Sequence, residues 1–250
     1  MEVDKLISEK LAKDDISLYQ FKSHPPQTIF APQWEYYAAG TILTNIDFQN
    51  IAKFILKIEN KILKKFKPSN YTNKKGILKT FDGYTGLGPN SLTSRSSNWN
   101  LLNYKQECSE IAKLSDAILD FHDKFLGELQ VVPEFYPKEL WIQCWANVLR
   151  KGEKIGIHMH SVNPDTYLGG FVCVQADTGE TSTQTHYVCP ANQLDDYNTI
   201  DIDNIVGEMT LFQNCIPHYS DTYMGEKERI TIAMDIVTEP YYPDNFIKLR

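Results

Sequence analysis

Residues 141–149 read Trp-Ile-Gln-Cys-Trp-Ala-Asn-Val-Leu, a run of aromatic and aliphatic residues that is typical of a buried β-strand. Similar short runs follow at residues 155–162, 167–175, 181–188, 208–213 and 229–237. Turn-forming sequences separate them, among them Lys151-Gly152, Asn163-Pro164-Asp165 and Asp177-Thr178-Gly179. Six or more short strands joined by tight turns predict a closed β-sandwich or barrel.

Two amphipathic helices are predicted before this β-rich region. Between Asp47 and Pro68, apolar residues recur at three- and four-residue steps with lysines on the other face, and Asn45 or Asp47 is a candidate cap. A second apolar stripe runs from about Gln106 to Leu129. We expect both helices to pack on one outer face of the barrel, and residues 1–45 to form loops and one or two strands that cover the core.

The length of 250 residues and the ordinary composition, 42% hydrophobic and 23% charged, predict one globular domain over residues 1–250. Within it, residues 1–136 form a helical and loop support region, and residues 137–240 form the β-rich core. No apolar run approaches the roughly 18 residues of a membrane span, and the N-terminus lacks a secretory signal. We therefore expect a cytoplasmic protein with no membrane partner.

Charge and cysteine content exclude two further classes of protein. The net charge is -7 and no basic block is present, so nucleic acid is not expected as a partner. The five cysteines are odd in number, widely spaced and without a C-x-x-C pair, which argues against a disulfide framework or a structural zinc site. Cys144 and Cys173 lie inside apolar runs and are predicted to be core residues.

Three of the six histidines occupy positions that indicate a metal site. His158 and His160 lie two apart in a predicted strand, so their side chains share one face with Cα atoms about 6.5 Å apart. His218 follows the strand at residues 208–213. A single strand histidine is usually a surface or core residue, but three imidazoles in this arrangement are able to share one ion. His186, in another predicted strand, is expected to have no metal role.

An arginine in the last predicted strand needs an anionic partner. Arg229 and Thr231 point to one face of the strand, whereas Ile230 and Ile232 point to the other. A buried arginine without a partner is costly. A small dicarboxylate would provide the missing negative charge.

The order of these motifs resembles the 2-oxoglutarate/Fe(II) oxygenase family related to prolyl hydroxylases. The resemblance covers roughly residues 141–237, and the sequences that carry it are Trp145-Ala-Asn147, Gly152, His158-Met-His160, Tyr167-Leu-Gly-Gly-Phe-Val172, Gly207-Glu-Met-Thr-Leu-Phe212, Pro217-His218 and Glu228-Arg229-Ile-Thr-Ile-Ala233. It implies a mainly β fold with helices (α+β), a double-stranded β-helix or jelly-roll, with the N-terminal helices packed on the major sheet.

The resemblance also implies an activity and a ligand set. His158 and His218 would bind Fe(II), Arg229 would bind the distal carboxylate of 2-oxoglutarate, and Thr231 would donate its hydroxyl to that carboxylate. Asn147 is a further candidate for the lining of the co-substrate pocket. With O2 as oxidant, such an enzyme hydroxylates a C–H bond of a peptide, protein side chain or small metabolite and releases succinate and CO2. A homodimer is an open possibility.

His160 departs from the family, in which a carboxylate usually stands at this position. His160 either binds the metal directly, leaves a two-histidine site completed by water or halide, or is replaced by the carboxylate of Asp165, Asp177 or Glu180. Two other functions stay open: a three-histidine zinc hydrolase or lyase, and a non-catalytic cupin-like metal-binding protein. In the loop at residues 90–95, Arg95 is a candidate for contact with an acidic substrate group, but we favour an ordinary solvated loop as the explanation.

Overall fold

The computed structural model describes residues 11–13, 16–31, 33–160, 166–177, 183–189, 199–240 and 245–250. The strands in these residues are β1 (Leu11–Lys13), β2 (Ile16–Lys22), β3 (Glu35–Ile42), β4 (Ser69–Thr72), β5 (Leu78–Phe81), β6 (Trp141–Leu149), β7 (Leu168–Gln175), β8 (Gln184–Val188), β9 (Thr199–Asp203), β10 (Glu208–Gln213), β11 (His218–Ser220), β12 (Arg229–Val237) and β13 (Ile247–Lys248). The helices are α1 (Phe48–Lys65), α2 (Ser109–Glu128) and the short 3-10 helices η1 (Thr93–Asn98), η2 (Leu101–Tyr104) and η3 (Pro133–Phe135).

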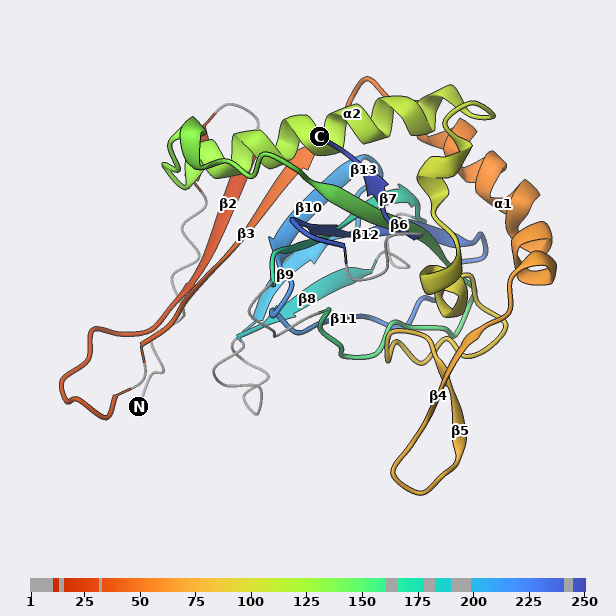
Figure 1. Cartoon of the computed structure of the whole chain (residues 1–250), viewed down its shortest axis with the longest axis horizontal. Coiled ribbons are helices and arrows are strands. Elements are labelled where there is room, and N and C mark those ends of the chain that lie inside the picture. The colour runs from red at the N-terminus through yellow and green to blue at the C-terminus, as the bar shows by residue number, and fades with distance from the viewer. Residues whose placement is uncertain are drawn as a thin grey trace.

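The strands form two main antiparallel sheets (Figure 1). The larger sheet has the order β1-β2-β3-β10-β7-β12-β6-β13, and the smaller has the order β11-β8-β9. A separate hairpin of β4 and β5 projects from the body of the molecule (Figure 1). The predicted mainly β class with helices is confirmed, and β6, β10 and β12 match the predicted strands at residues 141–149, 208–213 and 229–237.

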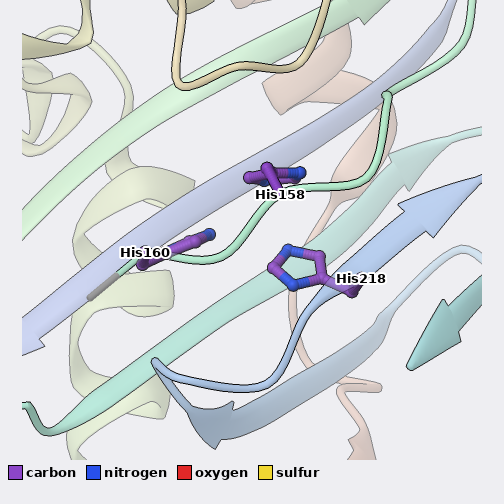
Figure 2. A group of neighbouring side chains, drawn as sticks. All are labelled: His158, His160 and His218. Carbon is purple, nitrogen blue, oxygen red and sulfur yellow. The ribbon is translucent and has the colours of Figure 1, made fainter. Parts of the chain in front are cut away.

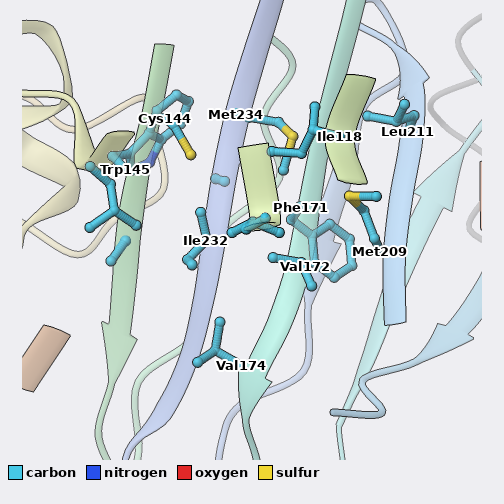
Figure 3. Close-up of a cluster of buried hydrophobic side chains, with 14 of the residues drawn as sticks. Ile118, Cys144, Trp145, Phe171, Val172, Val174, Met209, Leu211, Ile232 and Met234 are labelled. Carbon is cyan, nitrogen blue, oxygen red and sulfur yellow. The ribbon is translucent and has the colours of Figure 1, made fainter. Parts of the chain in front are cut away.

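Strand β12 lies at the centre of the core, between β6 and β7. Its alternate residues Ile230, Ile232 and Met234 are fully buried in the hydrophobic core, and Ile232 and Met234 are seen in Figure 3. On the opposite face, Arg229 and Thr231 line a cavity, as expected from the period of two residues along a strand. One strand therefore contributes both to the core and to the walls of the cavity.

Both predicted helices are present and pack against the larger sheet. The Asp47 side chain caps α1 by accepting a hydrogen bond from the backbone N–H of Asn50 at 3.1 Å. Helix α1 contacts β7, and α2 contacts β2 and sends Ile118 into the cluster of Figure 3. Among the described helices, none combines the length and the apolar character required to cross a membrane.

The N-terminal strands extend the larger sheet more than the sequence indicated. Residues 1–45 were expected to give one or two strands over the core; β2 and β3 pair over seven residues, and β3 continues the sheet beside β10. The hairpin of β4 and β5 was not predicted, because its residues are polar and mostly exposed and carry little apolar alternation.

Two expectations about irregular segments are wrong. Residues 155–160 do not form a regular strand, and a single bridge joins His158 to His218. A continuous ladder does not form because neighbouring backbone groups bind loops instead: the N–H of Gly156 donates to the carbonyl of Thr85 at 2.7 Å. Arg95, expected in a solvated loop, is not exposed to solvent. It is buried and donates to backbone carbonyls, including those of Phe66 and Ser91, so it holds the loop in place.

A histidine links the strands of the smaller sheet. His186 on β8 places Nδ1 2.8 Å from a carboxylate oxygen of Asp201 on β9 and Nε2 3.0 Å from one of Asp221, which follows β11. Burial alone would lower the pKa of His186, but the hydrogen bonds to Asp201 and Asp221 outweigh it, so the pKa is raised. The protonated ring donates to both acids at once.

Glycine is required at position 170 by the close approach of strand β10. A Cβ atom at Gly170 would lie 2.7 Å from the backbone carbonyl oxygen of Thr210 and 2.6 Å from a methyl group of Leu211. We expect Gly170→Ala to lower the free energy of unfolding by about 1–3 kcal/mol, because the strands must move apart. Chemical denaturation measures this loss. Gly40→Ala on β3 is the matched control, since its Cβ finds only ordinary contacts at 3.5 Å or more; equal losses in both variants would contradict the explanation.

The His186 bridge predicts a pH-dependent stability difference between wild type and His186→Gln. Because the folded-state pKa of His186 is raised, its stabilisation is fully present below the unfolded value of about 6.5 and is lost as the pH rises through the folded-state value. We expect the free energy of unfolding of the wild type to exceed that of the variant most at pH 5.5–6.5. The difference should shrink above that range, as measured by chemical denaturation at each pH. A difference that grows with pH would refute this assignment.

Candidate metal centre

A cavity lies between the inner faces of the two sheets. Trp145, Phe171 and Arg229 of the larger sheet line it from one side, and Thr185 and Ser220 of the smaller sheet line it from the other. The three histidines predicted to form a metal site also line this cavity. The sheets thus bring together side chains that are distant in sequence, such as Trp145 and Arg229, which are 84 residues apart.

His158, His160 and His218 form one cluster, as predicted, and their rings face a common point (Figure 2). One ring nitrogen from each lies within 4.8 Å of those of the other two. The bridge between His158 and His218 consists of two backbone hydrogen bonds of 3.1 and 2.9 Å. Backbone hydrogen bonds therefore hold His158 and His218 next to each other.

The hydrogen bonds around two of these rings determine which nitrogen is free to bind a metal. Nδ1 of His158 lies 2.9 Å from the carbonyl oxygen of Gly156, and Nδ1 of His218 lies 3.0 Å from that of Ile216. Because a carbonyl oxygen only accepts hydrogen bonds, each Nδ1 carries the proton and each Nε2 keeps its lone pair. A metal ligand requires such a lone pair.

Burial also keeps these two rings neutral. Burial is the main cause and repulsion from His160 the second cause that lower the pKa of His158 to about 4. For His218, burial is again the main cause, and repulsion from His158 and His160 adds to it, so the pKa lies well below its usual value. Both rings are neutral at pH 7, so their donor set fits a divalent transition metal such as Fe(II) or Zn(II).

His160 is held by a carboxylate, and this partner was missed at the level of sequence. Its Nδ1 makes a hydrogen bond to a carboxylate oxygen of Asp235 on β12. Asp235 lies on the same face of the strand as Arg229 and Thr231, so the two-residue period could have placed it on that face but could not have identified His160 as its partner. The rings of Trp145 and Phe212 flank His160 at centroid distances of 6.1 and 5.7 Å.

Of the three carboxylates considered as replacements for His160, only Asp177 belongs to the described residues, and it does not join the cluster. Asp177 accepts a hydrogen bond from the backbone N–H of Glu226 at 2.9 Å and does not belong to the group of possible ligands. Asp165 and Glu180 lie outside the residues that the structure describes. His186 is also absent from the cluster, since its ring binds Asp201 and Asp221.

Arg229 is almost completely buried, and its donors are not all satisfied. One terminal nitrogen donates to the side-chain oxygen of Asn204 at 2.8 Å, whereas Nε and the other terminal nitrogen have no partner among the described residues. Burial lowers the pKa of Arg229, but a guanidinium remains charged in proteins. A buried cation with unused donors on the wall of a cavity is chemically suited to pair with an anion.

Thr231 and Asn147 lie beside Arg229 on neighbouring strands. They are paired in register, and the amide nitrogen of Asn147 lies 3.4 Å from the Thr231 hydroxyl. The Asn147 oxygen accepts a hydrogen bond of 2.5 Å from the hydroxyl of Thr93 in η1. Because Thr231 accepts from Asn147, its own O–H remains free to donate. Asn147 lines the cavity as predicted, but its contacts orient Thr231.

Comparison with known proteins reveals similarity in structure but not in sequence. No protein-family model matches the chain, and no curated protein matches it. Among solved structures, a prolyl hydroxylase from Trichoplax adhaerens in complex with a hypoxia inducible factor oxygen degradation domain peptide fragment aligns with a TM-score of 0.53 at 14% identity, over 82% of this chain and 86% of that chain. A prolyl-4-hydroxylase from Pseudomonas putida aligns with a TM-score of 0.47 at 8% identity, over 81% and 93% of the two chains.

We assign the fold from the similarity to the Trichoplax structure. At 14% identity the likeness extends to the path of the backbone, over most of both chains. The resemblance to prolyl hydroxylases inferred from the motifs of residues 141–237 is therefore confirmed in the fold. The described chain has the fold of a prolyl hydroxylase.

Proposed function

We propose that the protein is an Fe(II)- and 2-oxoglutarate-dependent dioxygenase that hydroxylates a C–H bond of its substrate and releases succinate and CO2. The proposal includes a double-stranded β-helix built from the two facing sheets, within a single domain that spans the chain. A peptide, a protein side chain and a small metabolite are the substrate classes that we consider. The Trichoplax relative in fold contains a peptide fragment, which makes a peptide a reasonable first choice.

The observation that carries this proposal is the unsatisfied guanidinium of Arg229 in the same cavity as the three histidines. A site that only bound zinc for hydrolysis would not require a buried arginine with two free donor nitrogens. A dicarboxylate co-substrate explains both features, because one carboxylate binds Arg229 while the other end reaches the metal. The free hydroxyl of Thr231 adds a second donor for the carboxylate at Arg229.

The residues of the chain would hold and orient the reactants. His158 and His218, with His160 as the third member, would hold Fe(II) through nitrogens that carry lone pairs. Bound Fe(II), together with 2-oxoglutarate and O2, supplies the oxidising power for attack on an unactivated C–H bond. With three histidines as ligands, an Fe(II) ion held here would still be open to the co-substrate and O2. The apolar walls provided by Trp145 and Phe171 limit the access of water to the cavity.

Turnover of 2-oxoglutarate tests this function. Protein loaded with Fe(II) under anaerobic conditions, then given 2-oxoglutarate, ascorbate and air, is expected to release succinate and CO2. We expect Arg229→Met to raise the KM for 2-oxoglutarate by roughly 100-fold, because a buried charged partner is lost. Methionine fills the same space, and the apoprotein should remain folded in thermal unfolding, since the unsatisfied charge is removed.

Arg150→Met is the matched control. Arg150 forms an ion pair with Glu59 outside the cavity, so its loss should leave the KM for 2-oxoglutarate unchanged. Absence of succinate from the wild-type protein, together with zinc that is retained through purification, would reject the oxygenase and favour the zinc hydrolase or lyase.

A further inference from the structure

Asp235 is a partly buried acid next to His160 that the proposed reaction does not otherwise use. It lies on β12, on the same face as Arg229 but six residues further along the strand. Only 19% of its side chain is exposed, and only 8% of that of His160. The ring nitrogen Nδ1 of His160 binds its carboxylate directly. Two polar groups that are largely removed from water thus satisfy each other.

The surroundings of His160 are shaped to keep the ring in this position. Gly169 lies opposite Asp235 in the pairing of β7 with β12. A Cβ atom at Gly169 would lie 3.0 Å from Nδ1 of His160 and 2.6 Å from the side-chain oxygen of Asn214. The backbone N–H of His160 donates to the carbonyl of Asn214 at 3.0 Å. The missing side chain at position 169 therefore leaves room for the imidazole next to the acid.

His160 differs from the other two histidines in the charge of its partner. His158 and His218 direct Nδ1 to neutral backbone carbonyls, whereas His160 directs it to a carboxylate. A carboxylate partner fixes the tautomer of a histidine and makes the opposite nitrogen a stronger donor to a metal. Asp235 itself is not in the group of possible ligands, so any effect on a metal passes through His160.

We propose that Asp235 is a positioning residue that makes His160 the third metal ligand. Its carboxylate accepts the Nδ1 proton of His160 and leaves the Nε2 lone pair facing His158 and His218. Through the imidazole it also supplies the negative charge that a directly bound carboxylate would bring to the site. This inference rests on the proposed function only in taking the three-histidine cluster as a metal site.

Titration of the apoprotein with Co(II), followed by its visible absorption, tests this role. We expect Asp235→Asn, which keeps the shape of the side chain but removes its charge, to raise the Kd for Co(II) by about 10- to 100-fold and to alter the absorption bands. His160→Ala should also raise the Kd. In the double variant, the Kd for Co(II) should equal that of His160→Ala alone, because Asp235 acts only through the His160 ring.

Asp201→Asn is the matched control. It removes the charge from another acid that is paired with a histidine, on the smaller sheet and outside the cluster, so the Kd for Co(II) should not change. Thermal unfolding of each apoprotein establishes that the variants are folded, and Asp235→Ser replaces Asp235→Asn if the latter is not. An unchanged Kd in the Asp235 variant, or an equal loss in the His160→Ala background, would overturn the proposal.

The titration is independent of the activity test, because it requires neither 2-oxoglutarate nor O2. Co(II) binding with the expected pattern in the variants, but without succinate from the Fe(II) protein, would reject the oxygenase and leave the role of Asp235 intact. Succinate formation with no effect of Asp235→Asn on Co(II) affinity would reject the role of Asp235 alone.

Discussion

The hydrogen-bonded ladder of β12 with β6 and β7 is the constraint on which the remaining structure depends. Along β12, isoleucine and methionine side chains belong to the hydrophobic core, while Arg229 and Thr231 on the opposite face line the cavity and Asp235 on that face binds His160. A shift of the pairing by one residue would exchange these faces, bury the charges in the apolar core and expose the isoleucines. The same register therefore maintains the core and the site, and neither is able to change without the other.

The cavity is built at a cost that the fold must bear. The guanidinium of Arg229 is desolvated while two of its donor nitrogens lack partners, and each unsatisfied buried group costs on the order of 1–3 kcal/mol. The long ladders of the larger sheet and the apolar layer under α1 and α2 offset that cost. A bound carboxylate would accept hydrogen bonds from these two nitrogens and remove that cost, so the unsatisfied guanidinium favours an occupied cavity over an empty one.

The histidine cluster depends on contacts between segments that are distant in sequence. Backbone hydrogen bonds join His158 to His218, a carbonyl or carboxylate orients each ring, and Gly169 leaves space for His160. Rings held in this way lose little freedom when a metal binds. His160 stands where the sequence resemblance leads one to expect a carboxylate, and the structure places the carboxylate of Asp235 on its Nδ1.

Local patterns were enough to predict the two helices, the strands β6, β10 and β12, the histidine cluster and the inward direction of Arg229, because alternation and helical spacing reflect burial directly. The irregular path of residues 155–160, the burial of Arg95 and the pairing of Asp235 with His160 arose only in the tertiary structure. These features depend on partners 29 to 75 residues away. No periodicity within one segment encodes such partners, since their contacts are created when the sheets and loops close around the cavity.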